Sequence, residues 1–270
     1  MTNTAPYTAP LRLHWWKAKP NFGDALSPLL LAHVSGRVVK HAKADTADVF
    51  ALGSLMQVVR RSFHHPRDGA KPVIWGSGLL HPPAGFKFLD NIDIALLRGP
   101  ITAALLNIET TEFGDPGLLV NDVLPAEEDP SDVIGIVPHH TLADDPALMA
   151  LIDADDAYVL IDPRNPAELV CAQIAACAHI FASSLHGLIT ADAYGVPNTW
   201  VAPDGQGWLK FYDYAASVGR ALRLPITLDQ LATAPKPTGR ALPYQDGIDA
   251  CRVALRTSFP AHLRADRGAA

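Results

Sequence analysis

The sequence has few cysteines, and their spacing excludes two common structural devices. Cys171, Cys177 and Cys251 are odd in number, form no C-x-x-C pair and do not lie beside a histidine at metal-ligand spacing. A disulfide framework and a structural zinc site are therefore disfavoured. Cys171 and Cys177 fall in an alanine-rich helical pattern, where small buried thiols are expected. Unpaired cysteines are typical of a reducing compartment, so we expect a cytoplasmic protein.

Two phosphate-binding fingerprints are also missing. No G-x-G-x-x-G follows the first predicted strand with an acidic residue at the proper offset, and no G-x-x-x-x-G-K-[ST] occurs. A nicotinamide-dependent enzyme and a P-loop NTPase are therefore disfavoured, and the sequence predicts neither a resident cofactor nor a metal.

Basic stripes and long apolar runs are absent as well. The 22 lysines and arginines are scattered through a chain with a net charge of -6, which argues against DNA or RNA as partners. No segment reaches the length of a membrane span, and residues 1–10 have neither a basic nor an apolar signal region. We therefore expect a soluble protein that is at most peripheral to a membrane.

What the chain does contain is a repeated strand–turn–helix pattern. With 270 residues, 49% of them apolar, it can form two domains. Residues 125–132 are acidic and contain two prolines, which is typical of a linker. We predict an α/β fold of two Rossmann-like domains, residues 1–128 and 129–270, facing each other across a cleft, with a last helix (248–258) that packs back on the first domain. The predicted strands are residues 11–16, 49–54, 73–78, 92–97, 111–119, 134–137, 157–161, 179–182 and 198–201.

Residues 179–197 form the most informative unit. A short apolar strand leads into Ser183 and Ser184, either of which can cap a helix that stops at Gly195-Val196-Pro197. A helix N-terminus after a parallel strand is a place where anions bind. His186 lies in this first turn, either as a solvated side chain or as a functional one.

Polar residues follow the other predicted strands too. Asn21 and Asp24 suit a turn and a helix cap, and they suit sugar hydroxyls equally well. Arg98 is expected to point to where an anion would lie, or to pair with a carboxylate. A strand-end set of this kind describes a site for a small dianion handled by acid–base chemistry. Its members are Asn21, Asp24, Ser77, Arg98, His139, His140, Arg164, Ser183, Ser184 and His186.

Several short motifs occur together between Leu11 and Val201. They are Asn21-Phe22-Gly23-Asp24, Trp75-Gly76-Ser77-Gly78, Leu97-Arg98-Gly99-Pro100, Gly114-Asp115-Pro116, Ile134 to His139, and Ser183-Ser184-Leu185-His186-Gly187 followed by Ala191, Tyr194, Gly195 and Pro197. The set resembles the polysaccharide pyruvyl transferases, which move a pyruvyl group from phosphoenolpyruvate onto a sugar as a ketal. The resemblance implies a fold similar to the two-domain GT-B glycosyltransferases.

The resemblance also implies a branch of the family and its acceptor. The Ser-Ser-Leu-His-Gly form looks like that of the bacterial exopolysaccharide enzymes, whose acceptors are lipid-linked oligosaccharides at the inner membrane. Many members carry arginine where this chain has Ser184. Arg98, Arg164 or a histidine would then have to supply the missing cation.

From the resemblance we expect phosphoenolpyruvate as co-substrate and a division of roles. His186 would be the general acid, His139 the base and Arg98 a clamp. The donor side would comprise Arg98, Arg164, Ser183, Ser184, His186, Gly187 and His140, and the acceptor side Asn21, Gly23, Asp24, Gly76, Ser77, Gly78 and Asp115.

Two other functions stay open at this point. A nucleotide-sugar glycosyltransferase of the same architecture would need a carboxylate for the ribose, and Glu168 is the one candidate near a helix start in the second half. A non-catalytic partner in polysaccharide assembly would account for Ser184 in place of arginine.

Overall fold

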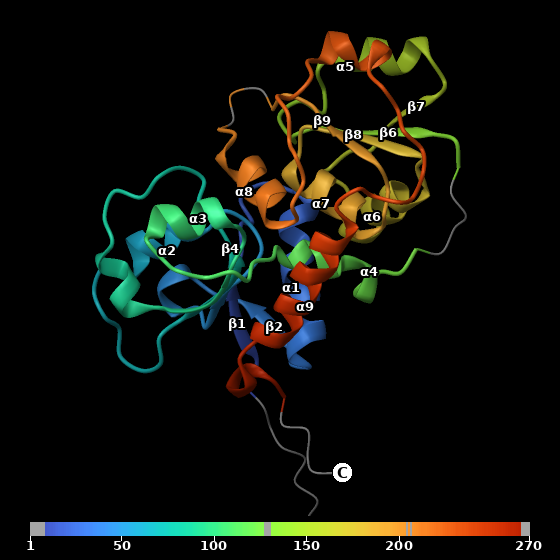
Figure 1. Cartoon of the computed structure of the whole chain (residues 1–270). Helices are drawn as coiled ribbons and strands as arrows, with labels where there is room; N and C mark the ends of the chain where they lie inside the picture. Colours follow the sequence, from blue (N-terminus) through green and yellow to red (C-terminus); the bar gives the residue numbers. More distant parts are fainter. Residues whose placement is uncertain (1–8, 127–130, 204, 206, 266–270) are drawn as a thin grey trace, which may run out of the picture.

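The computed structural model describes residues 9–126, 131–203, 205 and 207–265, and these build two parallel sheets (Figure 1). The first has the strand order β2-β1-β3-β4-β5 and the second β7-β6-β8-β9. Every strand pair within them is parallel. The predicted α/β class with two Rossmann-like sheets is therefore confirmed.

The elements have the following bounds. The strands are β1 (Leu11–His14), β2 (Val39–His41), β3 (Val49–Phe50), β4 (Val73–Ser77), β5 (Asp93–Leu97), β6 (Ile134–Val137), β7 (Tyr158–Leu160), β8 (His179–Ala182) and β9 (Asn198–Trp200). The helices are α1 (Phe22–Ser35), α2 (Met56–Ser62), α3 (Pro100–Leu106), α4 (Val120–Val123), α5 (Pro146–Ala154), α6 (Ala167–Ala176), α7 (Leu185–Ala193), α8 (Leu209–Ser217) and α9 (Gln245–Ser258).

Several central strands are buried along their whole length, as is typical of parallel sheets that are covered on both faces. Every residue of β4 and of β8 is buried. The register of β6 against β8 pairs Val137 with Ala182. The two strands therefore end side by side, which brings Ser183 next to the residues that follow β6.

Two sequence-based expectations about local structure are wrong. Residues 111–119 form no strand: after a single bridge from Phe113 to Leu97, the chain turns into a 3-10 helix at Pro116–Leu119. Asp115 caps this turn by accepting a hydrogen bond from Gly117 N (2.9 Å), and Pro116 has no N–H for a strand ladder. In addition, α1 begins at Phe22 because Asn21, not Asp24, is its N-cap, with Gly23 N donating to Asn21 Oδ1 (3.0 Å).

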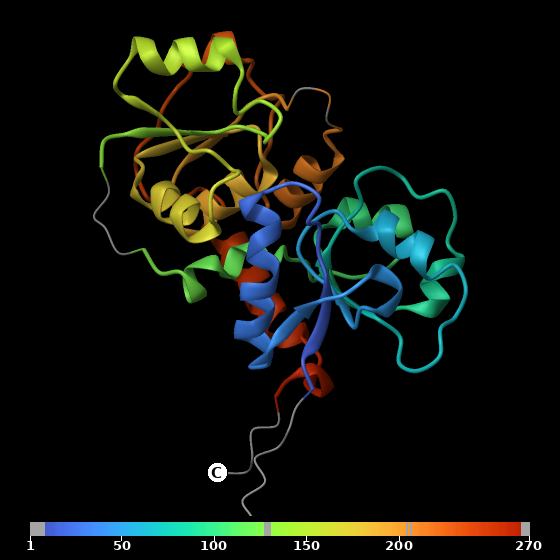
Figure 2. The same cartoon turned by 180° about the vertical axis from the view of Figure 1, so that it is seen from behind.

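The two sheets share one apolar core, and α9 returns to the first of them. The core runs from Leu11 and Trp75 in the first sheet to Val137 and Ile180 in the second. Trp75 Nε1 donates to the carbonyl of Leu255 in α9 (3.1 Å). Figure 2 shows α1 between the two sheets. Residues 127–130, which contain the predicted boundary, lie outside the described residues.

Within the described ranges, no helix is both long and apolar enough to cross a membrane.

Candidate active site at the meeting of the two halves

His186 lies where α7 meets the start of α1. Ser184 is the N-cap of α7, and its Oγ accepts a hydrogen bond from Gly187 N (3.4 Å). A Cβ on Gly23 would lie 2.0 Å from His186 Nδ1, so the imidazole packs directly on the backbone at this position. The Nε2 atom is buried and has no hydrogen-bond partner among the described residues. His186 is therefore held between α7 and the first turn of α1, and it is not a solvated side chain.

The surroundings of His186 favour its neutral form. Burial, assisted by the positive charges of Lys210 and Arg98, lowers the pKa of His186 to about 3. An anion bound beside the ring would oppose these effects and favour the imidazolium. The protonation state of this histidine is thus expected to depend on what the site binds.

Asp24 reaches the same region from the other half. It lies in the first turn of α1, and its Oδ1 would be 3.8 Å from a Cβ on Gly53. Burial raises the pKa of Asp24 to about 7, and the charge of Lys210 opposes this shift. A carboxyl with a pKa near neutrality can accept and release protons under physiological conditions.

His139 and His140 follow β6 and face the turn after β8. The backbone N–H of His139 donates to Ser183 Oγ (2.8 Å), and its Nδ1 lies 2.8 Å from Thr141 Oγ1. The two rings are 4.1 Å apart. Burial, assisted by His140, Lys210 and Lys19, lowers the pKa of His139 to about 4. Burial also lowers the pKa of His140, whose buried Nδ1 has no hydrogen-bond partner within the described part of the chain.

Two backbone N–H groups at the turn where an anion was expected to bind already have acceptors within the protein. The N–H groups of Ser183 and Ser184 both donate to the carbonyl of Val137 (3.1 and 3.4 Å). Gly187 N is capped by Ser184, and a Cβ on Gly187 would come within 3.0 Å of Val137 and Ala182. The first-turn donors without an acceptor inside the helix are thus those of Leu185 and His186.

The two arginines expected on the donor side are each paired with aspartates of the protein itself. The side chain of Arg98 is fully buried and pairs with Asp213 (Nε to Oδ2, 2.9 Å), while also donating to Ser54 Oγ (2.7 Å) and the Leu79 carbonyl (2.8 Å). Arg164 is partly exposed and pairs with Asp144 (2.6 Å) and Asp162 (2.7 Å). Both guanidinium groups are engaged by the protein itself.

Two residues expected on the acceptor side, Ser77 and Gly78, contact other parts of the first sheet and its loops. Ser77 Oγ donates to the Gly53 carbonyl (2.8 Å) and accepts from Leu55 N (3.1 Å). Gly78 packs against Arg98, because a Cβ there would lie 2.4 Å from the guanidinium carbon. Ser77 therefore holds the loop after β3, and Gly78 leaves room for the Arg98 side chain.

Gly76 and Asp115 are buried together at the same edge. Gly76 has a positive φ of 81°, and a Cβ on it would lie 2.3 Å from Pro116. Asp115 is fully buried, and burial raises its pKa to about 6.

Lys210 is the main site residue that the sequence analysis missed. It lies in α8, a helix that was not predicted, and its charge acts on Asp24, His139, His140 and His186. The signal was present, because Lys210 and Asp213 are three residues apart in an otherwise apolar segment, Trp208 to Ala215. Two charges at helical spacing among aromatic residues indicate a helix face that packs on polar groups.

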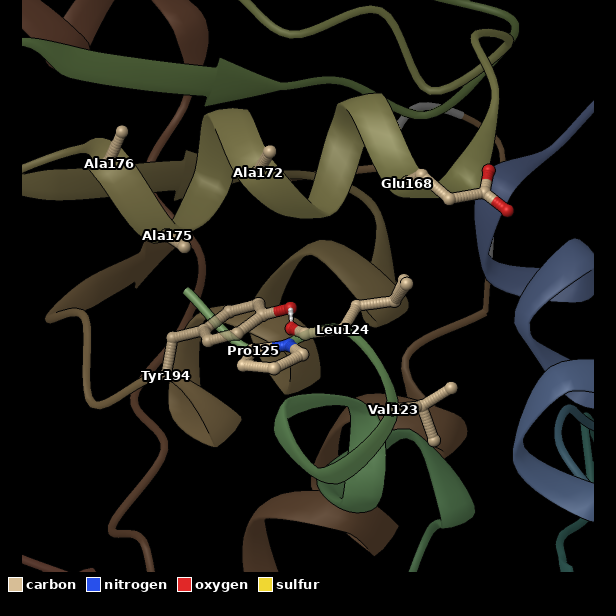
Figure 3. A pocket seen from close by; sticks show the side chains of 8 residues that line it. All are labelled: Val123, Leu124, Pro125, Glu168, Ala172, Ala175, Ala176 and Tyr194. Carbon is tan, nitrogen blue, oxygen red and sulfur yellow. Dashed lines mark hydrogen bonds between the residues drawn. The ribbon is translucent and has the colours of Figure 1, made fainter. Parts of the chain in front are cut away.

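A separate cavity of about 280 Å³ lies between α4 and α6 (Figure 3). The hydroxyl of Tyr194, at its floor, donates to the Leu124 carbonyl (2.6 Å). Tyr194 follows the last residue of α7, eight residues from His186, or roughly 12 Å along a helix. Glu168, in the first turn of α6, also lines this cavity.

These features define an α/β protein of two parallel sheets with histidines at the strand ends, and comparison with known proteins identifies its family. A sequence model described as polysaccharide pyruvyl transferase matches residues 21–205. The chain belongs to this family.

Two relatives show partial similarity. The uncharacterized protein L143 of Acanthamoeba polyphaga mimivirus is 32% identical over 160 residues, which are 54% of this chain and 55% of that protein. The succinoglycan biosynthesis protein ExoV of Rhizobium meliloti (strain 1021) is 35% identical over 143 residues, which are 50% of this chain and 44% of that protein. The chain thus spans about half the length of the curated relatives it matches.

The raised pKa of Asp24 predicts a pH-dependent stability difference. Since the folded protein holds this proton up to about pH 7 and the unfolded chain releases it near pH 4, the folded state loses stability as the pH rises between these values. Wild type should lose about 2–3 kcal/mol in free energy of unfolding from pH 5 to pH 8 relative to Asp24→Asn, which has no proton to release at this position. Urea unfolding at both pH values measures this. The exposed Asp68→Asn controls for the loss of one negative charge, and the same difference from wild type in both variants would contradict the prediction.

Proposed function

We propose that the protein transfers a pyruvyl group from phosphoenolpyruvate to a sugar of an exopolysaccharide repeat unit, forming a ketal and releasing phosphate. The observation that supports this best is the packing of His186 on Gly23. These residues lie near opposite ends of the segment that matches the family, residues 21–205, and the fold brings them into contact. The name of ExoV, a succinoglycan biosynthesis protein, agrees with a polysaccharide as acceptor.

The proposed reaction transfers two hydroxyl protons. A proton is delivered to the methylene carbon of phosphoenolpyruvate, and one sugar hydroxyl attacks C2. The C2–O bond to phosphate then breaks, and a second hydroxyl of the same sugar closes the ketal. Of the two protons that leave the sugar, one ends on the new methyl group and the other on the released phosphate, so charge is conserved.

We assign the general-acid role to His186, with its imidazolium favoured by the bound trianionic donor. His139 and Asp24 are the candidate bases for the acceptor hydroxyl. The pKa of Asp24, about 7, favours this residue over His139, whose pKa is about 4. The first-turn N–H groups of α7 would contact the phosphate.

We further propose a GT-B-like arrangement with the acceptor on the side of residues 1–128 and the donor on the side of residues 129–270. Asn21 and Asp24 from α1 would then meet the sugar, and the histidines after β6 and β8 the donor. We also propose that the protein is cytoplasmic and that a lipid-linked acceptor would bring it to the inner membrane surface as a peripheral component.

Incubation with phosphoenolpyruvate and candidate glycosides or lipid-linked oligosaccharides tests the function. We expect phosphate release that depends on the acceptor, together with a ketal product seen by mass spectrometry. A nucleotide sugar offered with the same acceptors should not be consumed. Acceptor binding without phosphate release would support a non-catalytic role instead.

We expect the transfer to need no divalent cation, because the histidines at the strand ends can supply the positive charge that a donor anion requires. Activity should stay within about 2-fold of the untreated enzyme after incubation with excess EDTA, since no step in the proposed reaction calls for a metal. Phosphate release measured with EDTA, and again with added magnesium, checks this. Loss of activity that magnesium restores would contradict it.

A further inference from the structure

Ser54 lies at the same strand-end edge as Asp24, although the sequence analysis placed it in a predicted strand and gave it no role. It follows β3, which lies between β1 and β4 in the first sheet. Asp24 follows β1, and a Cβ on Gly53 would lie 3.8 Å from its Oδ1. The turn that carries Ser54 is therefore next to the first turn of α1.

The backbone on either side of Ser54 is fixed to the neighbouring strand. Ser77, the last residue of β4, donates from Oγ to the Gly53 carbonyl (2.8 Å) and accepts from Leu55 N (3.1 Å). Gly78 N also donates to the Gly53 carbonyl (3.2 Å). Because the residues before and after Ser54 are both hydrogen-bonded to β4 and the turn after it, the position of Ser54 is well determined.

Arg98 fixes the side chain of Ser54 as well. Its Nη1 donates to Ser54 Oγ (2.7 Å), while its Nε pairs with Asp213 (2.9 Å) and its Nη2 donates to the Leu79 carbonyl (2.8 Å). An arginine N–H can only donate, so Ser54 Oγ is the acceptor and its own proton points away from Arg98. Within the described residues this hydroxyl donates to no other group, and Ser54 is partly exposed. The oxygen is thus held in place while the proton faces outward.

The contact with Arg98 also makes this hydroxyl a better donor. A hydroxyl that accepts a hydrogen bond from a charged group is polarised by it, and the effect is stronger where the local dielectric is low. Arg98 and Asp213 are both fully buried. Ser77, in the Gly-Ser turn after β4, is fully buried and uses its hydroxyl within the protein. Of the two turns, the one after β3 therefore presents its hydroxyl to a ligand.

A sugar hydroxyl fits this position better than an anion does. It can accept a hydrogen bond from a serine and donate one to a carboxylate at the same time. Asp24 supplies the carboxyl group beside Gly53, and once ionised it repels phosphate and carboxylate groups. The charge of Arg98 is already balanced by Asp213. The donor and acceptor groups present here thus match a neutral hydroxyl.

We propose that Ser54 donates a hydrogen bond to the acceptor-sugar hydroxyl that faces Asp24, with Arg98 holding the serine oxygen in place. This inference rests on the proposed function, which supplies the sugar acceptor. It adds to the acceptor side a residue that lies outside the expected set.

Calorimetric titration of the full chain with methyl β-D-glucopyranoside, methyl β-D-galactopyranoside and their monodeoxy analogues tests the proposal. Ser54→Ala should weaken binding of the parent glycosides by about 3- to 10-fold, the loss of one hydrogen bond, and Ser54→Thr, which keeps a hydroxyl, by less than about 3-fold. The analogue that lacks the contacted hydroxyl should bind wild type and Ser54→Ala within about 2-fold of each other, because the partner of Ser54 is missing in both. In turnover assays the Michaelis constant for the acceptor should rise in Ser54→Ala while that for phosphoenolpyruvate changes little.

Thr102→Val is the matched control for disturbance of the Arg98–Asp213 network. Thr102 Oγ1 donates to Asp213 Oδ2 (2.7 Å) and accepts from Leu79 N (3.1 Å), so valine removes a hydroxyl from the same network and leaves Ser54 in place. This variant should be less stable than wild type and bind the glycosides within about 2-fold of wild type. Equal losses of glycoside affinity in Thr102→Val and Ser54→Ala would overturn the inference, because they would indicate a general effect of the network.

Two further outcomes separate this proposal from the function on which it rests. Wild-type protein that binds glycosides through Ser54 but releases no phosphate from phosphoenolpyruvate would contradict pyruvyl transfer and still support the sugar site. A folded Ser54→Ala protein that binds every glycoside as tightly as wild type would overturn the inference while leaving pyruvyl transfer standing. Loss of phosphoenolpyruvate affinity alone in Ser54→Ala would overturn it as well, because it would put Ser54 on the donor side.

Discussion

Replacing His186 with alanine is expected to lower turnover by about two to four orders of magnitude, the usual contribution of a general acid. The imidazole packs on Gly23, and its buried Nε2 has no partner within the described residues. Alanine removes the proton donor and leaves the first-turn N–H groups of α7 in place. Phosphoenolpyruvate should therefore still bind, more weakly than to wild type.

Steady-state phosphate release and calorimetric binding of phosphoenolpyruvate distinguish these effects. His65→Ala is a matched control, because His65 is exposed and lies in the segment between α2 and β4. A His186→Ala protein with near wild-type turnover would remove the chemical centre of the proposed reaction, whatever its affinity for the donor.

Arg98→Ala and Asp213→Ala are each expected to lower the free energy of unfolding by about 3–5 kcal/mol, because either change leaves a buried charge without its partner. Both side chains of the pair are fully buried. Asp213→Ala would also remove the acceptor of two hydrogen bonds from Thr102, one donated by its N–H and one by its hydroxyl. The sequence analysis assigned Arg98 to the donor, whereas its enclosure favours an effect on stability.

Urea unfolding measures this loss, and the double variant Arg98→Met with Asp213→Leu should recover part of it, since an apolar pair leaves no charge unpaired. Arg164→Ala is the comparison for an exposed pair and should cost about 0–1 kcal/mol. A stable Arg98→Ala protein that binds phosphoenolpyruvate poorly would restore the donor-clamp interpretation.

Local signals in the sequence were enough for most of the fold. Buried strands such as β4 and β8 are short continuous apolar runs, and their ends are marked by glycine and serine. The residues after β8 were readable as a helix cap because a serine hydroxyl satisfies the first-turn N–H groups. The strand predicted at residues 111–119 failed because Asp115 and Pro116 favour a turn over continued pairing.

By itself the sequence determined the two parallel sheets and the gathering of polar residues at their strand ends, because hydrophobic period and turn chemistry are local properties. Only the tertiary structure decided what each polar residue does there. Arg98 and Asp213 are 115 positions apart, and no local pattern announces their pairing. The same holds for the contact of His186 with Gly23 and for the charge of Lys210, since burial and long-range packing set both the partners of a side chain and its pKa.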